Sequence, residues 1–314
     1  MKRRTFLRNS ALAGASLSLG TLPYRGVASS MAAEPLEIHL FSKHLQFLDY
    51  EDMAIAAREM GFAGLDLTIR PGGHVEPENV ERDLPRAVTA MRRQGLEPKM
   101  FTTAIDNVDD RVNRMVLDRA AQHGFRHFRT NWVRYPETGG LPEALKAFKP
   151  QMKALADFNA RLNLQGAYQN HAGPYVGSSM WEVWTLIEDA DPAGLGSQYD
   201  IRHATVEGGM SWPTGLRLIH PRITTIVLKD FHWAKNGEGA WYAQNVPLGQ
   251  GMVDFGRYFR MLKDYGIQVP VSLHLEYELG GAQNGSKEVT MEPEKIFGAM
   301  KRDLATAQRL WEEA

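Results

Sequence analysis

Residues 50–69 read YEDMAIAAREMGFAGLDLTI and contain the unit from which the fold is built. In Tyr50–Met60 the apolar residues recur every three or four positions, which is typical of an amphipathic helix. Gly61 can adopt the left-handed conformation that ends such a helix, and the short strand-like run Gly64–Ile69 follows. This stretch predicts a helix followed directly by a strand, as in α/β proteins.

The same unit recurs along the chain, and Gly95, Gly124 and Gly266 also lie between a predicted helix and the next strand. Eight strands alternating with eight helices are typical of a (β/α)8 barrel, or TIM barrel. The predicted strands are Leu36–Ser42, Gly64–Ile69, Glu97–Thr102, His127–Trp132, Leu164–Gln169, Gly196–Ile201, Ile223–Lys229 and Val269–Glu276. The predicted helices are Tyr50–Met60, Val80–Gln94, Asp110–His123, Pro142–Leu162, Met180–Asp189, Thr205–Ile219, Asp254–Tyr265 and Pro293–Trp311.

The length of the chain after its first segment suits one such barrel. No linker or shift of composition divides residues 33–314, and a (β/α)8 barrel fills that length as a single domain. A doubly wound sheet is the alternative architecture. No Gly-x-Gly-x-x-Gly follows the first predicted strand, so the sequence carries no sign of a dinucleotide site and favours the barrel.

The first 32 residues differ from the rest and resemble an export signal. They begin MKRRTFLRNSALAG, where paired arginines precede Phe-Leu, an apolar run follows to Leu22, and small residues surround Ala32. That order is typical of a twin-arginine signal, and cleavage near Ala32 or Ala33 would release a periplasmic or secreted protein. A retained anchor is the alternative, but the apolar run is too short to span a bilayer comfortably. We therefore expect no membrane span after cleavage.

The net charge of the chain hides a division between this segment and the remainder. Residues 1–32 carry five basic residues and no acid, which leaves 31 basic and 37 acidic residues in the rest of the chain. An acidic body is a poor surface for a phosphate backbone, so nucleic acid is not an expected partner. The chain has no cysteine, which excludes thiolate catalysis, cysteine-based metal sites and disulfides.

Polar side chains follow most of the predicted strands. In a (β/α)8 barrel the strand ends and the loops after them form the active site. We therefore expect a polar pocket there that binds a small molecule. The candidate substrate-binding residues are His74 after the second strand, Asn131 on the fourth, His171 after the fifth, and His232 and Trp233 after the seventh.

The sixth and eighth strands carry the candidate acids. In YDIRH, Asp200 and His203 can together hold a divalent cation and a substrate hydroxyl, although Asp200 can equally cap the following helix. Strand alternation in HLEYE places His274, Glu276 and Glu278 on one face, which points into the barrel. A buried carboxylate needs a cation or a donor, so Glu276 is either a site residue or part of a structural ion pair.

Lys229 and His171 each have a functional and a structural interpretation. Alternation turns Lys229 inward, where it can bind substrate oxygens, act as an acid–base group or order the carboxylates through a salt bridge. His171 can ligate a metal, polarise a carbonyl or hydrogen-bond its own loop. The stretch Leu248–Phe255 is best explained as an ordinary loop in which Asp254 caps the next helix.

Several of these segments together resemble the xylose isomerase-like TIM barrels, a superfamily of sugar isomerases and epimerases. The resemblance covers roughly residues 36–311 and rests on the order of AYQNHAG (167–173), YDIRH (199–203), VLKDFHW (227–233), LGQGMVDF (248–255) and LHLEYELGG (273–281). The stretch RPGGHVEPENVERDLP (70–85) is similar to that of a secreted subset of the family. The resemblance implies a divalent ion held by Glu, Asp, His and Glu on strands five to eight, with the two glutamates moving the proton next to a carbonyl.

Carried over to this chain, the resemblance assigns Asp200 and Glu276 as metal ligands and places His203 near the reacting carbon. Two positions depart from the family pattern: Gln169 stands where a glutamate is expected, and Val227 stands where a histidine is expected. The expected cofactor is a divalent metal (Mn, Co, Mg or Zn), with Gln169 as a further and weaker ligand. Lys229, two residues after Val227, can place its ammonium near the vacated space.

The sequence thus leaves two functional hypotheses. The first is an exported enzyme that transfers a proton next to a carbonyl of a non-phosphorylated sugar or keto-sugar, by isomerisation, epimerisation or elimination, with Glu276, His203 and Lys229 as catalytic residues. The second is a degenerate sugar-binding barrel without a full metal site. A small carbohydrate is the expected partner in both, and the sequence leaves open whether the chain forms a homo-oligomer.

Overall fold

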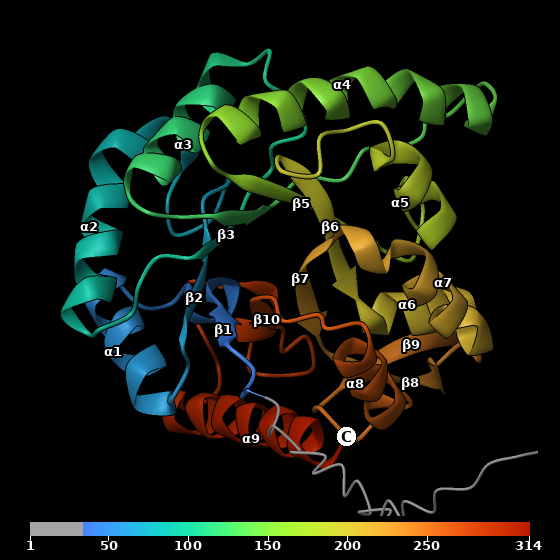
Figure 1. The fold of residues 1–314 in the computed structure, drawn as a ribbon. Helices are drawn as coiled ribbons and strands as arrows, with labels where there is room; N and C mark the ends of the chain where they lie inside the picture. The colour runs from blue at the N-terminus through green and yellow to red at the C-terminus, as the bar shows by residue number, and fades with distance from the viewer. Residues whose placement is uncertain (1–33) are drawn as a thin grey trace, which may run out of the picture. The chain divides into compact units, whose positions relative to one another are not determined.

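The structure, a computed structural model, describes residues 34–314 and contains a closed barrel of eight parallel strands (Figure 1). Around the barrel the strands follow the order β1-β10-β7-β6-β5-β4-β3-β2. The prediction of a single-domain (β/α)8 TIM barrel is confirmed, and the predicted export signal lies outside the described residues. The barrel strands are β1 (Ile38–Phe41), β2 (Gly64–Thr68), β3 (Met100–Thr102), β4 (His127–Arg129), β5 (Gln165–Gln169), β6 (Leu195–Asp200), β7 (Ile223–Leu228) and β10 (Val271–Leu273).

Helices alternate with these strands and form a ring outside the barrel (Figure 1). Gly61, Gly95, Gly124 and Gly266 all have positive φ, in agreement with their predicted role between helix and strand. The α-helices are α1 (Tyr50–Met60), α2 (Val80–Arg93), α3 (Arg111–Gln122), α4 (Leu141–Arg161), α5 (Met180–Ile187), α6 (Ile201–Gly208), α7 (Trp212–Ile219), α8 (Phe255–Asp264) and α9 (Pro293–Glu313). Short 3₁₀ helices are η1 (Ser42–Leu45), η2 (Pro77–Asn79), η3 (Gly209–Ser211), η4 (His220–Arg222) and η5 (Ala282–Asn284).

The helix predicted over Thr205–Ile219 is two helices in the structure. Helix α6 begins directly at the end of β6, earlier than predicted, and ends at Gly208. Gly209 then has φ 49° and ψ −123°, a conformation that cannot continue a helix. Pro213 lies in the first turn of α7, where its missing N–H costs nothing.

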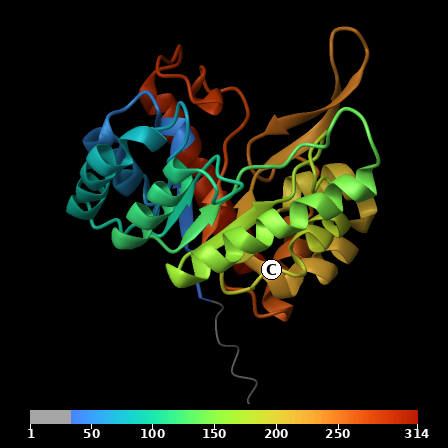
Figure 2. The same cartoon turned by 90° about the horizontal axis from the view of Figure 1, so that it is seen from above.

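A two-stranded hairpin follows β7 where the sequence predicted only a loop. It consists of β8 (Asp230–Lys235) and β9 (Trp241–Val246), paired antiparallel, and it projects away from the barrel (Figure 2). The side chain of Asn236 accepts hydrogen bonds from the backbone N–H groups of Glu238 and Ala240 and so shapes the turn. An Asn-Gly pair between two aromatic-rich runs was the available signal for this hairpin.

The inside of the barrel is polar near Asp66, which is fully buried on β2. One carboxylate oxygen accepts a hydrogen bond from Thr102 Oγ1 at 2.9 Å, and the other accepts one from Ser272 Oγ at 2.6 Å. Burial raises the pKa of Asp66. These bonds connect β2, β3 and β10 within the barrel, because Thr102 and Ser272 lie on the two other strands.

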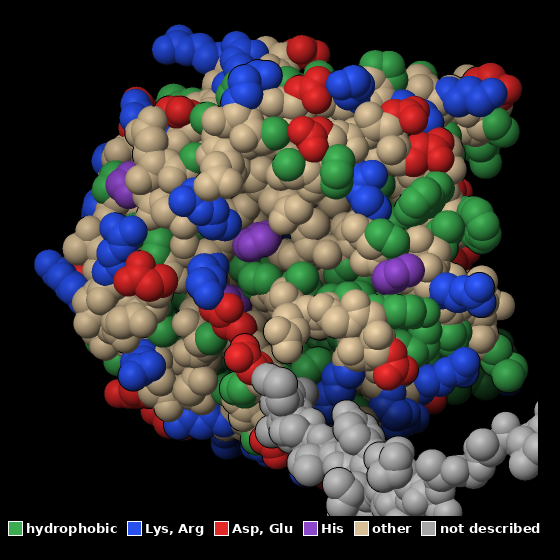
Figure 3. All heavy atoms as spheres, in the orientation of Figure 1, with side chains coloured by type: hydrophobic (Ala, Val, Ile, Leu, Met, Phe, Trp, Pro, Cys, Tyr) green, Lys and Arg blue, Asp and Glu red, His purple; other side chains and the backbone are tan. Residues whose placement is uncertain are grey.

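Two features of the described residues bear on large partners, namely the length of the helices and the distribution of charge on one face. No helix within residues 34–314 is long and apolar enough to cross a bilayer. On the face shown in Figure 3, basic and acidic side chains are interspersed. On this face, charge does not favour a large polyanionic partner.

Gly194 marks a close approach between α4 and the start of β6, and it offers a test of this packing. Its carbonyl accepts hydrogen bonds from Gly166 N and Asn159 Nδ2, and a Cβ added to it would overlap the backbone carbonyl of Ala156. We expect Gly194→Ala to lower the free energy of unfolding in urea by about 2 kcal/mol or more, as overpacking does. Gly237→Ala is the control, because nothing lies within 4 Å of a Cβ there. Equal stability of the two variants would contradict this packing.

Candidate active site

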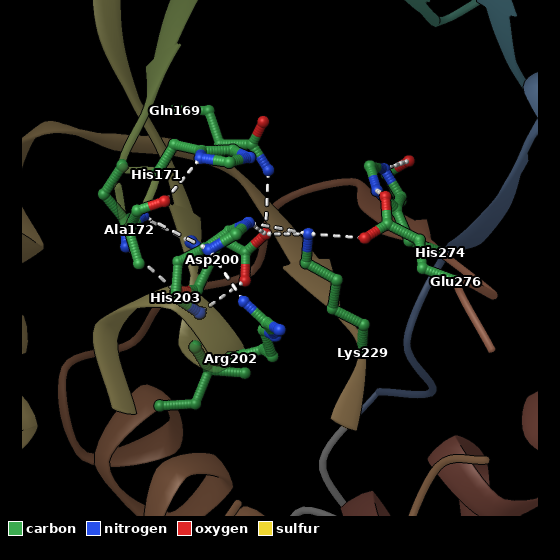
Figure 4. Close-up of polar contacts among 12 residues, drawn as sticks. Gln169, His171, Ala172, Asp200, Arg202, His203, Lys229, His274 and Glu276 are labelled. Carbon is green, nitrogen blue, oxygen red and sulfur yellow. Dashed lines mark hydrogen bonds and ion pairs between the residues drawn. The ribbon is translucent and has the colours of Figure 1, made fainter. Parts of the chain in front are cut away.

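The ammonium group of Lys229 lies at the centre of a cluster at the carboxyl ends of β6, β7 and β10 (Figure 4). Its Nζ is 3.1 Å from Asp200 Oδ2, 3.2 Å from Glu276 Oε2 and 2.8 Å from His203 Nε2. The Lys229 side chain is only 4% exposed. Lys229 thus directly contacts the other two predicted catalytic residues, His203 and Glu276, and the predicted metal ligand Asp200; Glu276 was also a predicted metal ligand.

Asp200 serves as a helix cap and as a member of this cluster. Its Oδ1 accepts a hydrogen bond from the backbone N–H of His203 at 3.0 Å, which caps α6. Its Oδ2 faces Lys229 and also accepts a bond from Gln169 Nε2 at 2.8 Å. Burial raises the pKa of Asp200, and the charge of Lys229 opposes this shift. The capping interpretation of Asp200 is confirmed, and its second carboxylate oxygen pairs with an ammonium and an amide.

Gln169, at the end of β5, is held at both ends of its amide. While Nε2 donates to Asp200, Oε1 accepts a bond from a terminal nitrogen of Arg129 at 3.3 Å. The backbone carbonyl of Gln169 accepts a third bond, from Trp132 Nε1. The amide oxygen is thus already engaged and does not point at Lys229.

These donors do not fit a divalent metal. The two carboxylates, Asp200 and Glu276, already share the ammonium of Lys229, and a second cation at that place would meet its charge. Val227, in place of the expected histidine, supplies no ligand, and the oxygen of Gln169 is bound to Arg129. Within residues 34–314, no three His, Asp or Glu side chains lie close enough together to hold a metal ion. Metal assistance therefore stays a prediction that the donor set does not favour.

Glu276 follows β10 and opens toward the barrel mouth, with 25% of its side chain exposed. Its Oε1 is 3.2 Å from Lys43 Nζ and 3.7 Å from His274 Nδ1, while Oε2 contacts Lys229. Burial raises the pKa of this carboxyl, but the charges of Lys229 and Lys43 lower it more, to well below its ordinary value. Glu276 is therefore ionised near neutral pH and accessible from the mouth.

Two histidines stack beside Lys229. The rings of His171 and His203 lie 3.9 Å apart between centroids, and His171 also packs against Trp132 and Tyr175. Burial and then the charge of Lys229 lower the pKa of His171 to about 4, and they lower the pKa of His203 to well below 6.5. Both rings are neutral near pH 7. His171 Nδ1 also contacts the carbonyl of Ala172, so its loop-ordering interpretation holds as well.

Of the predicted substrate-binding residues, His171 contacts the cluster through the ring of His203, and the other four make no hydrogen bond to the cluster within residues 34–314. Asn131 and Trp132 line a cavity of about 460 Å³ that adjoins His171 through the Trp132 ring. His74 instead uses its two ring nitrogens to contact Thr68 Oγ1 and the carbonyl of Leu45. His232 and Trp233 lie on β8, where Trp233 is 43% exposed, and no hydrogen bond within residues 34–314 connects them to Lys229.

Four cationic residues near the cluster were not among the predicted site residues: Lys43 in η1, Arg70 after β2, Arg129 at the end of β4, and Arg202 in α6 directly after β6. Each follows or ends a strand, and this position in the sequence could have identified them as site residues.

Glu278, by contrast, lies outside the cluster, because its carboxylate accepts hydrogen bonds from Gly280 N and Gln283 Nε2 within its own loop. Asp254 caps α8 as predicted, through a bond from Arg257 N.

The shared ammonium predicts a measurable coupling between Lys229 and Asp200. Lys229→Met leaves two buried carboxylates facing each other and should cost about 3–5 kcal/mol of unfolding free energy. Adding Asp200→Asn removes one of these charges and keeps a capping side chain, so we expect the double variant to regain at least about 1 kcal/mol in urea denaturation. Lys301→Met, at an exposed position of α9, is the control and should change stability little. A double variant that is less stable than the single one would contradict the shared charge.

Solved structures with the same fold support the barrel but do not establish an activity for this chain. The chain matches the probable 3-DHS dehydratase AsbF from Bacillus anthracis with a TM-score of 0.63 and 16% identity, over 86% of this chain and 98% of the other. It matches 3-keto-D-glucoside 4-epimerase from E. coli with a TM-score of 0.61 and 13% identity, over 87% and 99%. A xylose isomerase-like TIM barrel protein from Mycobacterium smegmatis in complex with magnesium gives 0.62 and 13%, over 86% and 98%.

No curated protein matches the sequence. At identities this low, the structural matches establish a shared fold only. The family comparison is stronger, because residues 54–292, most of the chain, match the family described as Xylose isomerase-like TIM barrel. The chain therefore belongs to the xylose isomerase-like TIM barrel family.

Proposed function

We propose that this protein is an exported enzyme that moves a proton next to the carbonyl of a non-phosphorylated sugar or keto-sugar. The observation that carries the proposal is the pair formed by Glu276 and Lys229, an ionised carboxylate open to the mouth with a buried ammonium 3.2 Å away. One group can accept a proton from carbon, and the other can stabilise the negative charge that then forms on oxygen.

The step follows from the positions of these groups. Glu276 takes the proton from the carbon beside the carbonyl, and the electron pair of that C–H bond forms a C=C bond while the carbonyl π electrons move to oxygen. The ammonium of Lys229 donates a hydrogen bond to this developing oxyanion. His203 and Asp200, at 2.8 and 3.1 Å, hold the ammonium in place.

Three outcomes share this enolate-like intermediate. Delivery of a proton to the same carbon from a donor on its other face gives an epimer. Delivery to the former carbonyl carbon, with transfer of the neighbouring hydroxyl proton to the former carbonyl oxygen, gives an isomer. Loss of a group from the next carbon, together with a proton, completes an elimination. Among the proteins of similar structure are an epimerase of a keto-glucoside and a probable dehydratase, which supports both kinds of outcome for this chain.

A second candidate is a sugar-binding barrel without catalysis. It is favoured by the two departures at Gln169 and Val227, together with the ion pairs that already occupy both oxygens of Glu276. For catalysis, a substrate has to displace Lys43 or Lys229 from that carboxylate. The two candidates differ in whether a bound sugar exchanges its carbon-bound proton with solvent.

The test is proton exchange in D₂O. We expect the protein to remove the NMR signal of a C–H group next to the carbonyl of D-fructose or of a 3-keto-glucoside. Glu276→Gln should slow this exchange by about 100-fold or more, as loss of a general base does. Because the donor set does not fit a metal, exchange should be unchanged by a chelator and by added Mn²⁺.

Glu278→Gln is the matched control, since its carboxylate is bonded within its own loop and it should retain exchange. Sugar binding without exchange in the unmodified protein, tested over the same panel, would exclude the enzyme and favour the binding barrel. Exchange that depends on Mn²⁺ and is lost with a chelator would overturn the metal-independent form of the proposal.

Export is a separate part of the proposal and rests on the sequence of residues 1–32. Replacing Arg3 and Arg4 together by Lys should strongly reduce the amount of protein in periplasmic extracts, because a twin-arginine signal depends on that pair. Arg8→Lys leaves the pair intact and is the control. Unchanged export of the Arg3/Arg4 variant would contradict this route.

A further inference from the structure

Arg129 is a buried cation with few partners. The residue is 4% exposed, and its one side-chain hydrogen bond goes to a neutral acceptor, Gln169 Oε1, at 3.3 Å. Its Nε has no partner among the described residues. The guanidinium instead lies over the ring of Trp132, 4.1 Å from its centroid. Burial lowers the pKa of Arg129 to about 9, so the group stays charged at neutral pH.

Arg70 is a second guanidinium with no anionic partner in the described part of the chain, although it is half-buried rather than buried. It follows β2 and lies over the ring of Phe41, with Cζ 5.5 Å from the centroid. Within residues 34–314 its side chain makes no hydrogen bond to a protein acceptor and no ion pair within 4 Å. Burial lowers its pKa, and the charges of Asp66 and Glu276 oppose that shift.

The two arginines face the catalytic cluster across the barrel mouth. From the strand order, β2 lies opposite β6 and β4 lies opposite β10. Arg70 therefore lies across from Asp200, and Arg129 lies across from Glu276. After burial, the charge of Arg70 is the largest influence that lowers the pKa of Arg129, so the two guanidiniums repel each other.

The charges around the mouth do not balance. Glu276 is already paired with Lys43 and Lys229, Asp200 with Lys229, and the buried Asp66 with two hydroxyl groups. Arg202 is a further cation here, because it lies beside His203 and, although burial lowers its pKa, the charges of Asp200 and Glu276 oppose that shift. Three carboxylates thus face five cations: Lys43, Arg70, Arg129, Arg202 and Lys229. Stacking on Trp132 and Phe41 alone compensates little, since a cation–π contact is worth much less than the desolvation of a guanidinium.

We infer that Arg70 and Arg129 bind an anionic group of the substrate, a carboxylate, so that the substrate is a sugar acid rather than a neutral sugar. The inference rests on the proposed function, whose reacting carbon lies beside Glu276. Planar guanidinium groups donate paired hydrogen bonds to a carboxylate, and two arginines can hold it while the sugar chain extends across the mouth. The same donors can bind a phosphate, so the experiment has to separate these two anions.

The test is binding, measured by calorimetry at low salt on the full protein, with D-glucuronate, D-gluconate, D-glucose and D-glucose 6-phosphate as probes. We expect the two carboxylates to bind at least about tenfold more tightly than glucose and more tightly than the phosphate, with affinity that falls as salt is raised. Arg70→Gln and Arg129→Gln should each weaken carboxylate binding by roughly tenfold to a hundredfold, as loss of a charge-assisted hydrogen bond does, and should leave glucose binding unchanged.

Arg93→Gln is the control, because Arg93 pairs with Glu51 on the outside of the barrel. Arg129→Lys keeps the charge and guards against misfolding, and it should retain more carboxylate affinity than Arg129→Gln. Equal binding of glucuronate and glucose, or tighter binding of glucose 6-phosphate, would overturn the inference.

The D₂O exchange distinguishes the two proposals. Exchange of neutral sugars without any preference for acids would leave the proposed function standing and reject the acid substrate. Binding of acids that show no exchange would reject the proposed function and leave the acid as a ligand of Arg70 and Arg129.

Discussion

The site depends on one buried cation. The ammonium of Lys229 contacts Asp200, Glu276 and His203 at 2.8–3.2 Å, and it has to be present for two carboxylates to lie together in the interior. Without it, desolvation would push at least one carboxyl to its neutral form. The ionisation of Glu276 depends on this charge, and the ammonium also pairs with Asp200, which caps α6 and accepts a hydrogen bond from Gln169.

The departures from the family pattern become consistent when they are considered together. A glutamate in place of Gln169 would add a third carboxylate beside Lys229, whereas the amide can donate to Asp200 and accept from Arg129 at once. Val227 supplies no ligand at the position where the family pattern has a histidine, and Lys229 supplies a positive charge from the same strand end. Gln169, Val227 and Lys229 together form a site in which a lysine ammonium supplies the positive charge.

The sequence predicted the barrel well because the alternation of strand and helix is a local pattern that recurs eight times, and four of the helices are followed by a glycine before the next strand. It predicted less of the site, since which strand ends meet across the mouth depends on barrel closure. His74 illustrates the limit: it follows a strand, yet its ring is bonded to Thr68 and Leu45. The hairpin that carries His232 and Trp233 was missed because a strand that lies outside the barrel leaves no trace in the alternation of strands and helices.

Charge was the least predictable property of the site and the most informative one. The body of the chain is acidic, yet the barrel mouth carries five cations against three carboxylates. Overall composition reports the solvated surface, where charges are screened and inexpensive, whereas the mouth is partly desolvated and every unpaired charge there costs free energy. Because Arg70 and Arg129 bear such a cost, an anionic group on the ligand would relieve it, and this relief would favour acids over neutral sugars at the same site.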